Sequence, residues 1–420
     1  MRTECIKVVH IGTAISHSSA PLRIHKAVKK AGVESCILTF QKSIENEDVH
    51  LAKKNLKYKI WNKFMFYYEK KQLGKYSKEN LPFSFGAMGI DLSQNEFVKN
   101  ADIIHLHWIN GQFLSYYNIK QLAKLKKPIV WTFHDSWPMT GGCHVRYGCE
   151  GFKKNCGCCP ELNSLNPKDI TAKIMRQKRE IYPTDKIITV APSKWMHDNI
   201  NESSLFGKCY NVQIGNPLDL EIFSGKDGNG KDEKIRILFG ASGALELEYK
   251  GYQYFAKAME YLYKTQKELA AKIEINIFGT EIKEFPGLEN YECKALGYIK
   301  SEEKMAEMYR NADIYVFPSL DDNLPGTVME SLACETPVVA FQTGGVPELV
   351  QHKINGYVAK YKDSVDLADG IVWVKENRNE MKLGKKAREH IEMRYNEEII
   401  GKNYVDLYKG SLKVNERRKI

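Results

Sequence analysis

Long apolar runs are absent from this sequence of 420 residues. No stretch reaches the roughly 18 apolar residues that a membrane-spanning helix needs. The first residues, MRTECIKVVHIGTA, hold only a short apolar run, which is typical of a first strand opening into a loop and not of a signal peptide. We therefore expect a cytoplasmic protein without a transmembrane segment.

Nucleic-acid recognition motifs are also absent, although the net charge is +10. The charge alone gives no reason to expect a nucleic-acid partner. Hydrophobic residues make up 43% of the chain and charged residues 27%, which is typical of a folded globular protein. A chain of this length is too long for one ordinary core, so two domains are expected.

Lysines and aromatic residues are interleaved in residues 51–80. At helical spacing, much of the apolar set falls on one side with lysines around it; the set is Leu56, Ile60, Trp61, Phe64, Phe66 and Tyr67. Such a helix can lie on an anionic membrane surface, which would make the protein peripheral on the inner face of the membrane. It can equally pack its aromatic side on the domain and leave a solvated basic face. Both interpretations stay open.

Strand-like and helix-like segments alternate along the whole chain, and the alternation begins again near residue 216. This pattern predicts two α/β halves with parallel sheets, which bind ligands at the carboxyl ends of their strands. We expect an N-terminal domain at 1–215 and a C-terminal domain at 216–396. The amphipathic helix at about 397–420 is expected to pack back on the first domain.

The stretch VFPSLDDNLPGTVMESLACETPVVAFQTGG (316–345) carries the densest chemical signal. A strand ends in a loop that leads to a helix start near Gly326, where unsatisfied N–H groups form an anion site suited to phosphate. Asp322 and Glu330 lie eight positions apart across that helix start, and each carboxylate can accept hydrogen bonds from two vicinal sugar hydroxyls. Gly344 and Gly345 end the next strand, where a loop without side chains can approach the same phosphates.

A simpler interpretation of the same spacing is also open. Asp322 can cap the helix, and Glu330 can be an ordinary solvated residue.

The surrounding residues bear on that choice, because the stretch resembles the donor-site motif of the retaining glycosyltransferases of family 4. That motif has two acidic residues separated by seven, a proline-containing strand and a Gly-Gly turn. Most of residues 1–410 is similar to the family, including the segments SSAPLRIHKAVKKAGVES, ADIIHLHWINGQFLS, VWTFHDSWPMTGGC and LGYIKSEEKMAEMYRNADIYVFPSL. The resemblance implies a GT-B fold, in which two Rossmann-like α/β/α domains face each other across a cleft.

The resemblance implies roles for the C-terminal candidates. Glu330 matches the residue that usually binds the ribose hydroxyls of the nucleotide. Asp322 matches the residue that touches the donor sugar near the reaction centre, and it is one methylene shorter than the usual glutamate. Lys250 matches the lysine of a basic pair that neutralises the diphosphate, whereas Ala241 and Ser242 stand where the arginine is expected.

In the N-terminal half, the resemblance implies two further site residues. Gly12 is retained in the loop that commonly approaches the diphosphate or the acceptor, and Ser18 and Ser19 stand where glycines are frequent. His134 matches a histidine near the donor sugar; its alternative role is to hydrogen-bond loop backbone. The nearby histidines of HLHW (105–108) are expected to be structural.

Family membership implies transfer with retention of anomeric configuration and without a catalytic metal, and the chain has no Asp-x-Asp motif of the other glycosyltransferase fold. The expected partners are a UDP- or GDP-sugar donor and a glycan or lipid-linked glycan acceptor. The expected activity is hexose transfer in cell-surface polysaccharide biosynthesis. The alternatives are a non-catalytic sugar-nucleotide-binding protein and a sugar-nucleotide epimerase.

Five of the ten cysteines fall within residues 143–159. Cys143, Cys149, Cys156 and Cys159 have spacing suited to a structural zinc ion, with Cys158 as a spare. Similar cysteine loops occur in a subset of the family. Disulfides and free thiols remain alternatives, although a reducing cytoplasm disfavours disulfides.

Overall fold

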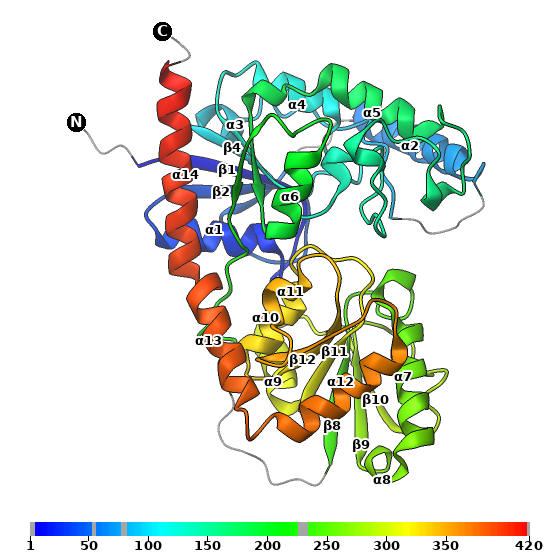
Figure 1. The fold of residues 1–420 in the computed structure, drawn as a ribbon. Helices are drawn as coiled ribbons and strands as arrows, with labels where there is room; N and C mark the ends of the chain where they lie inside the picture. The colour runs from blue at the N-terminus through cyan, green and yellow to red at the C-terminus, as the bar shows by residue number, and fades with distance from the viewer. Residues whose placement is uncertain (1–4, 53–55, 77–81, 226–233, 418–420) are drawn as a thin grey trace. The chain divides into compact units, whose positions relative to one another are not determined.

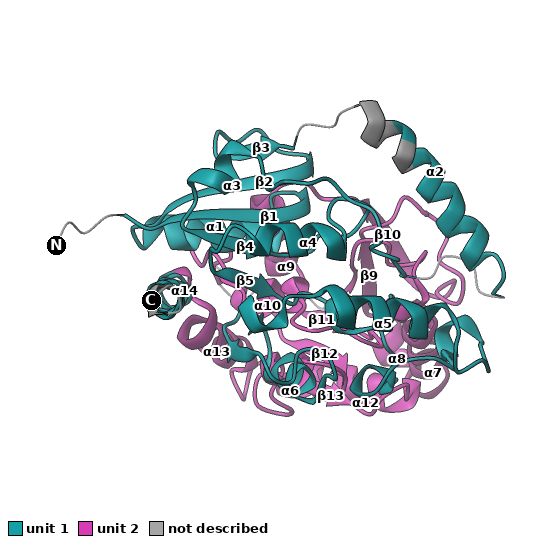
Figure 2. Cartoon of the chain, turned by 90° about the horizontal axis from the view of Figure 1, so that it is seen from above, with its two compact units in different colours: residues 1–215, 398–420 teal, residues 216–397 magenta. Residues whose placement is uncertain are grey.

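The computed structural model describes residues 5–52, 56–76, 82–225 and 234–417. Side chains of residues 56–59, 61, 62, 416 and 417 lie outside the description. The chain divides into two compact units, residues 1–215 with 398–420 and residues 216–397 (Figure 2). We call them unit 1 and unit 2 and describe each by itself.

Unit 1 is built on a parallel sheet of seven strands in the order β3-β2-β1-β4-β5-β6-β7 (Figure 1). The strands are β1 (Lys7–Ile15), β2 (Glu34–Lys42), β3 (Val49–Leu51), β4 (Ile103–Leu106), β5 (Ile129–Thr132), β6 (Ile187–Ala191) and β7 (Tyr210–Gln213). Neighbouring residues face opposite sides of the sheet, and both sides are buried: Val8 belongs to one hydrophobic cluster and Val9 to another. This explains why the strands read as continuous apolar runs.

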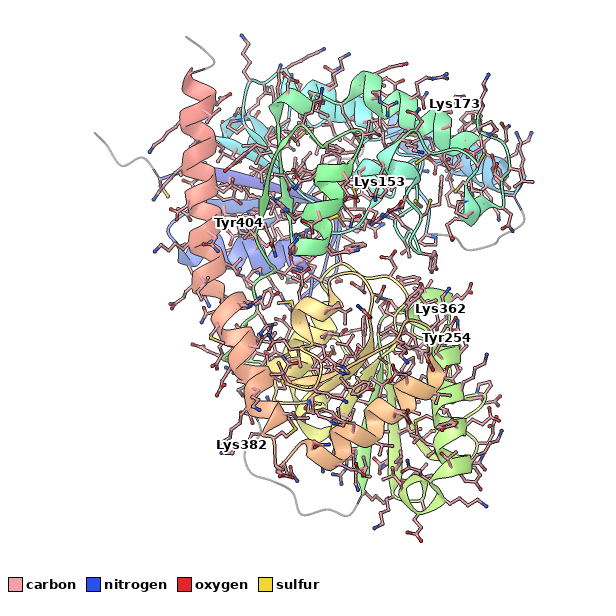
Figure 3. All side chains as sticks on the ribbon, viewed as in Figure 1. Lys153, Lys173, Tyr254, Lys362, Lys382 and Tyr404 are labelled. Atoms are coloured by element: carbon pink, nitrogen blue, oxygen red, sulfur yellow. The ribbon has the colours of Figure 1, made fainter. Side chains whose placement is uncertain are left out.

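Seven α-helices of the described residues belong with this sheet: α1 (Ala20–Lys30), α2 (Leu56–Leu73), α3 (Glu96–Asn100), α4 (Tyr116–Ala123), α5 (Ile170–Ile181), α6 (Lys194–Glu202) and α14 (Glu397–Arg417). The last helix comes from the far end of the sequence. Its Ile400, Tyr404 and Tyr408 are buried in the same cluster as Val8 and Ile24 (Tyr404 is labelled in Figure 3). Apolar contact on one stripe of α14 therefore holds it on unit 1.

Unit 2 is built on a parallel sheet of six strands in the order β10-β9-β8-β11-β12-β13. The strands are β8 (Ile235–Gly240), β9 (Ile273–Phe278), β10 (Glu292–Gly297), β11 (Ile314–Phe317), β12 (Val338–Phe341) and β13 (Gly356–Ala359). Its helices are α7 (Tyr252–Thr265), α8 (Lys267–Ala270), α9 (Glu302–Asn311), α10 (Gly326–Ala333), α11 (Val346–Leu349), α12 (Ser364–Asn377) and α13 (Leu383–Tyr395). Ser301 caps α9 through a hydrogen bond from the Lys304 N–H.

One local expectation is wrong. Gly12 lies inside β1, paired with Thr39 of β2, and not in the loop after the strand. The strand continues to Ile15 because its backbone keeps pairing with β2, up to Lys42, after the apolar pattern has ended. The pattern of apolar and polar side chains indicates which residues are buried, but it does not show where the backbone pairing between two strands ends.

Candidate active site

Three loops of unit 2 are joined at the carboxyl ends of β11 and β12. The Leu320 N–H donates to the Tyr249 carbonyl at 2.8 Å, and the Thr343 hydroxyl donates to the Leu320 carbonyl at 2.9 Å. The Gly345 N–H donates to the Asp322 carbonyl at 3.1 Å. These bonds fix the loop that carries Asp322 between the loop before α7 and the loop after β12. This is the end of a parallel sheet where ligands bind.

Two glycines make this close approach of backbones feasible. Gly344 has a φ of +52°, and a Cβ atom there would lie 1.7 Å from the Asp322 carbonyl oxygen. Gly251 has a φ of +78°, and its Cβ would lie 1.9 Å from the Pro318 carbonyl oxygen. Any other residue would clash with backbone, which cannot move aside cheaply. The glycines therefore shape the loops of the site before any ligand arrives.

Lys250 and Asp322 form an ion pair within this group of loops. The distance from Nζ to Oδ2 is 3.5 Å, and the side chains are 14% and 23% exposed. The Lys250 ammonium also lies over the Tyr249 ring, 4.6 Å from its centroid. The pair brings together the two residues expected to meet the diphosphate and the donor sugar.

Glu330 lies on α10 and is only 2% exposed. Its Oε2 accepts a hydrogen bond from the Tyr309 hydroxyl at 3.1 Å. Burial first, and then Glu330, raises the pKa of Tyr309 well above its ordinary value, so the phenol stays a donor. Glu330 is thus an oriented, buried carboxylate and not a solvated surface residue. Tyr309 lies on another helix, α9, and no spacing rule in the sequence points to it.

Helix α10 begins at Gly326, after Pro325, and no side chain caps it. Asp322 is therefore not the cap of this helix, which removes the simpler interpretation of its position. The orphan N–H groups at the start of an uncapped helix remain suited to an anion.

In unit 1, His134 follows β5 and belongs to a chain of three hydrogen-bonded imidazoles. His134 Nε2 lies 3.0 Å from His107 Nδ1, and His107 Nε2 lies 2.8 Å from His10 Nδ1. Burial lowers the pKa of His134 to about 4, although Asp135 opposes the shift, and burial lowers the pKa of His10 and His107 well below the usual range. All three rings are therefore neutral at physiological pH.

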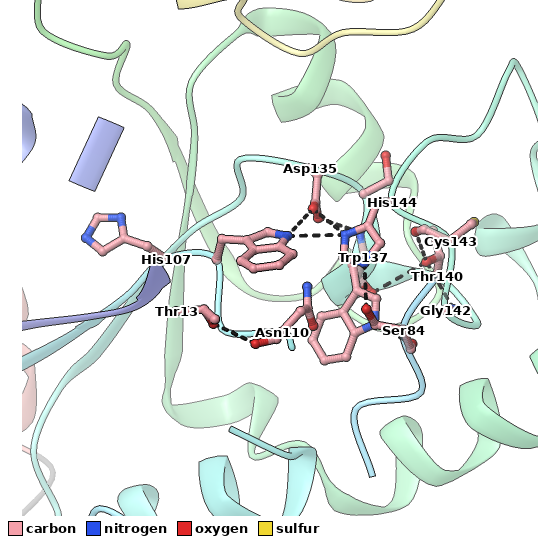
Figure 4. A network of polar contacts seen from close by, with 12 residues as sticks. Thr13, Ser84, His107, Asn110, Asp135, Trp137, Thr140, Gly142, Cys143 and His144 are labelled. Atoms are coloured by element: carbon pink, nitrogen blue, oxygen red, sulfur yellow. Dashed lines mark hydrogen bonds and ion pairs between the residues drawn. The ribbon is translucent and has the colours of Figure 1, made fainter. Parts of the chain in front are cut away.

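Asp135, next to His134, forms a second polar network (Figure 4). Its Oδ2 lies 2.6 Å from His144 Nδ1 and accepts a hydrogen bond from the Trp108 indole at 2.8 Å, while Oδ1 accepts from the Trp137 N–H at 2.9 Å. Burial raises the pKa of Asp135, but His144 and these hydrogen bonds outweigh it and leave the pKa below its ordinary value. No motif in the sequence predicts this network, because Trp108, Asp135 and His144 come from separate loops.

The cysteine loop places several backbone donors on sulfur. Cys149 Sγ accepts a hydrogen bond from the Gly151 N–H at 3.4 Å. Burial raises the pKa of the Cys159 thiol, and hydrogen bonds from the N–H groups of Leu162 and Glu161 offset part of this rise. No disulfide joins any of the ten cysteines, all of which lie in the described residues. Within the described residues, the four predicted ligands do not bring three sulfurs within 4.8 Å of one another. The donor chemistry suits zinc. Burial first, and then Cys156, Cys159 and Cys149, raise the pKa of Cys143, so the four thiols lie near one another.

Helix α2 exposes most of the apolar side chains that the structure describes on it. Ile60, Phe64, Phe66 and Tyr67 are 60–77% exposed. Part of the predicted segment 51–80, namely 53–55 and 77–81, lies outside the described residues, as does the side chain of Trp61. No helix in the described ranges is both long and apolar enough to cross a membrane.

Residues 236–377, which hold Lys250, Asp322 and Glu330, match the family model described as "Glycosyl transferases group 1". This part of the chain is a group 1 glycosyl transferase domain. It includes all predicted site residues of unit 2, whereas Gly12, His134 and the four predicted cysteine ligands lie outside the matched range. The family expectation from the sequence is thereby confirmed.

Similar proteins extend the likeness beyond the glycosyl transferase domain. The chain is 27% identical over 267 residues to the putative colanic acid biosynthesis glycosyl transferase WcaC of Escherichia coli (strain K12), a match that covers 60% of this chain and 62% of WcaC, less than two thirds of its length. It is 23% identical over 412 residues to N-acetyl-alpha-D-glucosaminyl L-malate synthase of Bacillus anthracis, covering 94% and 98%.

Among solved structures, Anabaena Alr3699/HepE in complex with UDP-glucose superposes with a TM-score of 0.61 at 11% identity, covering 96% of this chain and all of that one (100%). With two parallel sheets of seven and six strands, the fold is GT-B, made of two Rossmann-like units. The predicted fold class is confirmed.

Proposed function

We propose that this glycosyltransferase moves a hexose from a nucleotide-sugar to a glycan acceptor, with retention of anomeric configuration, in the synthesis of a cell-surface polysaccharide. The observation that carries the proposal is the Lys250–Asp322 pair, held among the loops at the ends of β11 and β12 beside the start of α10. A cation, a helix N-terminus and a carboxylate side by side suit a diphosphate joined to a sugar. The WcaC relative, named for colanic acid biosynthesis, supports the polysaccharide role.

Each residue has a proposed part in the reaction. Lys250 and the first N–H groups of α10 stabilise the charge of the departing phosphate, and Glu330 holds the ribose hydroxyls. Asp322 positions the donor sugar by accepting from its hydroxyls. The role of His134 at the donor sugar is carried over from the family resemblance alone. Positioning and charge stabilisation supply the rate enhancement, with no catalytic metal.

The proposed nucleotide is UDP or GDP, and UDP is the first to test because the similarly folded HepE has been solved with UDP-glucose. Glu330 sets a condition on this proposal. Because it is only 2% exposed, the ribose can reach its carboxylate only if the surrounding loops open or if the nucleotide enters along the remaining exposed edge.

We further propose a lipid-linked acceptor at an anionic membrane surface on the inner face of the membrane. The support is α2, where Ile60, Phe64 and Tyr67 are exposed at helical spacing together with Lys63 and Lys71. Apolar side chains that enter the headgroup region and lysines that meet anionic lipid form such a surface. The membrane would bring the enzyme to an acceptor that does not leave the bilayer.

Calorimetric titration of UDP, GDP, ADP and dTDP into the purified protein tests the donor site, with Glu330→Ala as the control. One nucleotide should bind, and the variant should lose this binding.

For turnover, the protein is incubated with UDP-glucose or GDP-mannose and a lipid extract, and the anomeric proton coupling of the product is measured by NMR. Binding without turnover would identify a non-catalytic binder, and a changed sugar without an acceptor would identify an epimerase. No binding at all would overturn the donor-site assignment.

A further inference from the structure

Ser84, His144 and Asp135 of unit 1 form a line of hydrogen bonds (Figure 4). Ser84 Oγ lies 2.9 Å from His144 Nε2, and His144 Nδ1 lies 2.6 Å from Asp135 Oδ2. The serine and the histidine are 60 positions apart in the chain. A hydroxyl, an imidazole and a carboxylate in this order form the nucleophilic site of serine hydrolases, which recurs on unrelated folds and is recognised by its geometry.

The carboxylate fixes the direction of both hydrogen bonds. Burial raises the pKa of Asp135, but His144 and hydrogen bonds bring it below its ordinary value, so the carboxylate is ionised at neutral pH and can only accept. His144 Nδ1 must therefore carry a proton and donate it to Asp135. In the neutral ring, Nε2 is then the acceptor, and the Ser84 hydroxyl donates to it. An imidazole in this tautomer can take the proton of the serine as a general base.

Two further donors hold the carboxylate in place. The Trp108 indole nitrogen lies 2.8 Å from Asp135 Oδ2 and 3.3 Å from His144 Nδ1. The carboxylate oxygen is the nearer acceptor and carries the charge, so the indole N–H donates to Asp135. Oδ1 accepts from the Trp137 N–H at 2.9 Å. Asp135 is thus oriented independently of His144, as the third member of such a site must be.

A short antiparallel pairing of backbone places the serine beside the histidine. The Ser84 N–H donates to the Gly142 carbonyl at 2.9 Å. The His144 N–H donates to the Pro82 carbonyl, also at 2.9 Å. Since side chains alternate between the two faces of paired strands, Ser84 and His144 lie on the same face. The nucleophile and its base are therefore positioned before any substrate binds.

The group is not sealed in the core. The side chains of His144 and Asp135 are 10% and 23% exposed, and Ser84 is half-buried. All of these residues belong to unit 1, and the proposed donor site of unit 2 uses none of them.

We propose that Ser84 is the nucleophile of an esterase site in unit 1, with His144 as its base and Asp135 as the residue that orients the base. Ser84 Oγ forms a bond to the acyl carbon of a carboxylic ester, and its proton passes to His144 Nε2. The ester C–O bond breaks, and the alcohol leaves with that proton. Water then attacks the acyl-serine and gives a proton to His144, which returns it to Ser84 Oγ as the carboxylic acid is released.

The decisive experiment treats the full-length protein with a fluorophosphonate probe. The probe forms a P–O bond to an activated serine oxygen and loses fluoride, whereas an ordinary serine hydroxyl is too weak a nucleophile to react. Mass spectrometry of the peptides should find the adduct on Ser84, and unfolding in urea before the treatment should prevent it. An unmodified Ser84 in the native protein would overturn the proposal, and this outcome requires no variant.

Substitutions of the two partners test their roles. His144→Gln should slow formation of the adduct roughly 100-fold, because the general base is lost. Asp135→Asn should also slow it, because the ring is no longer held with its proton on Nδ1. His197→Gln is the matched control, since His197 Nδ1 lies 3.5 Å from the carboxylate of Asp198, and its rate should not change. Equal rates in His144→Gln and the unaltered protein would refute the role of the histidine.

Hydrolysis of p-nitrophenyl acetate measures turnover. The unaltered protein should release more than one equivalent of nitrophenolate per chain, and Ser84→Ala should release it much more slowly. Equal release by the two proteins would overturn the esterase activity. No nucleotide-sugar is present in these experiments, so a failure of the proposed glycosyl transfer would leave their outcome unchanged.

Discussion

The ammonium group of Lys250 lies 3.5 Å from the carboxylate of Asp322, although the two residues are 72 positions apart in the chain. The pair joins the loop before α7 to the loop after β11. Each charge is partly compensated by the other before a donor binds. In the proposed donor complex, the diphosphate would therefore compete with Asp322 for Lys250, and the donor sugar would offer Asp322 hydrogen bonds in exchange.

Replacing Lys250 by methionine tests this arrangement. We expect kcat/KM to fall by roughly 10- to 100-fold, because a charge-assisted contact to phosphate is lost. Steady-state release of the nucleotide measures the effect. Lys257→Met is the matched control, since Lys257 is exposed on α7, and its activity should not change. Equal losses in both variants would contradict a specific role for Lys250.

The Tyr309–Glu330 hydrogen bond predicts coupled effects on nucleotide affinity. Glu330→Gln should weaken binding roughly tenfold by removing the charge that ribose hydroxyls meet. Tyr309→Phe should weaken it less, because the carboxylate stays but loses its orienting donor. Calorimetry on both single variants and the double variant gives the coupling energy. Affinities that are unchanged in all three would show that the carboxylate is only part of the core.

The cysteine loop predicts metal content. We expect about one zinc ion per chain in protein purified without chelator, measured by mass spectrometry of the metal, and its loss in the double variant Cys156→Ser/Cys159→Ser. Cys158→Ser is the control, because Cys158 is exposed and its thiol donates to the Leu165 carbonyl. Metal-free protein with a mass lower by two hydrogens per bridge would indicate disulfides, and a full-mass protein would indicate free thiols.

Helix α2 predicts binding to anionic lipid. Flotation with phosphatidylglycerol vesicles should recover the protein, whereas phosphatidylcholine vesicles should recover much less. Phe64→Ser and Tyr67→Ser remove exposed apolar area and should reduce recovery without loss of folded protein, since both side chains are at least 60% exposed. The control Leu165→Ser removes an apolar side chain that is 94% exposed elsewhere on unit 1. Equal recovery by all variants would exclude α2 as the contact.

The buried histidines predict loss of stability in mild acid. His134 has a pKa lowered to about 4 by burial, against an ordinary value of about 6.5, so the unfolded chain binds more protons between these two values. The free energy of unfolding of unit 1 should therefore fall as the pH drops from about 6.5, by up to about 1.4 kcal/mol per pH unit for each such histidine. His10, His105 and His107 add to the slope in the same direction.

Urea unfolding at pH 7.5 and pH 5.5 measures this slope through tryptophan fluorescence, which reports mainly on unit 1 because five of the six tryptophans lie there. Aspartates such as Asp135 titrate at lower pH and do not contribute in this window. A His10→Phe variant should show a shallower slope. A stability that is independent of pH between these values would show that the histidines are charged in the folded state.

The sequence determined the parallel α/β architecture, because strands buried on both faces and helices with one apolar stripe leave periodic patterns that local physics explains. It also pointed to Asp322 and Glu330, because they lie in one contiguous stretch made of a strand, a loop and a helix start. It pointed to Lys250 because that residue matches a family motif. The extent of β1, and with it the place of Gly12, depended on backbone pairing that side-chain patterns do not record.

Only the tertiary structure decided which side chains act together. Tyr309 donates a hydrogen bond to Glu330, and His107 is hydrogen-bonded to His134. In each pair the two residues come from neighbouring elements of the fold and not from the same segment of the chain. The sequence assigned His107 a merely structural role for that reason. Hydrogen bonds form between groups that are close in space, and in a parallel sheet the neighbours of one strand end come from distant parts of the chain.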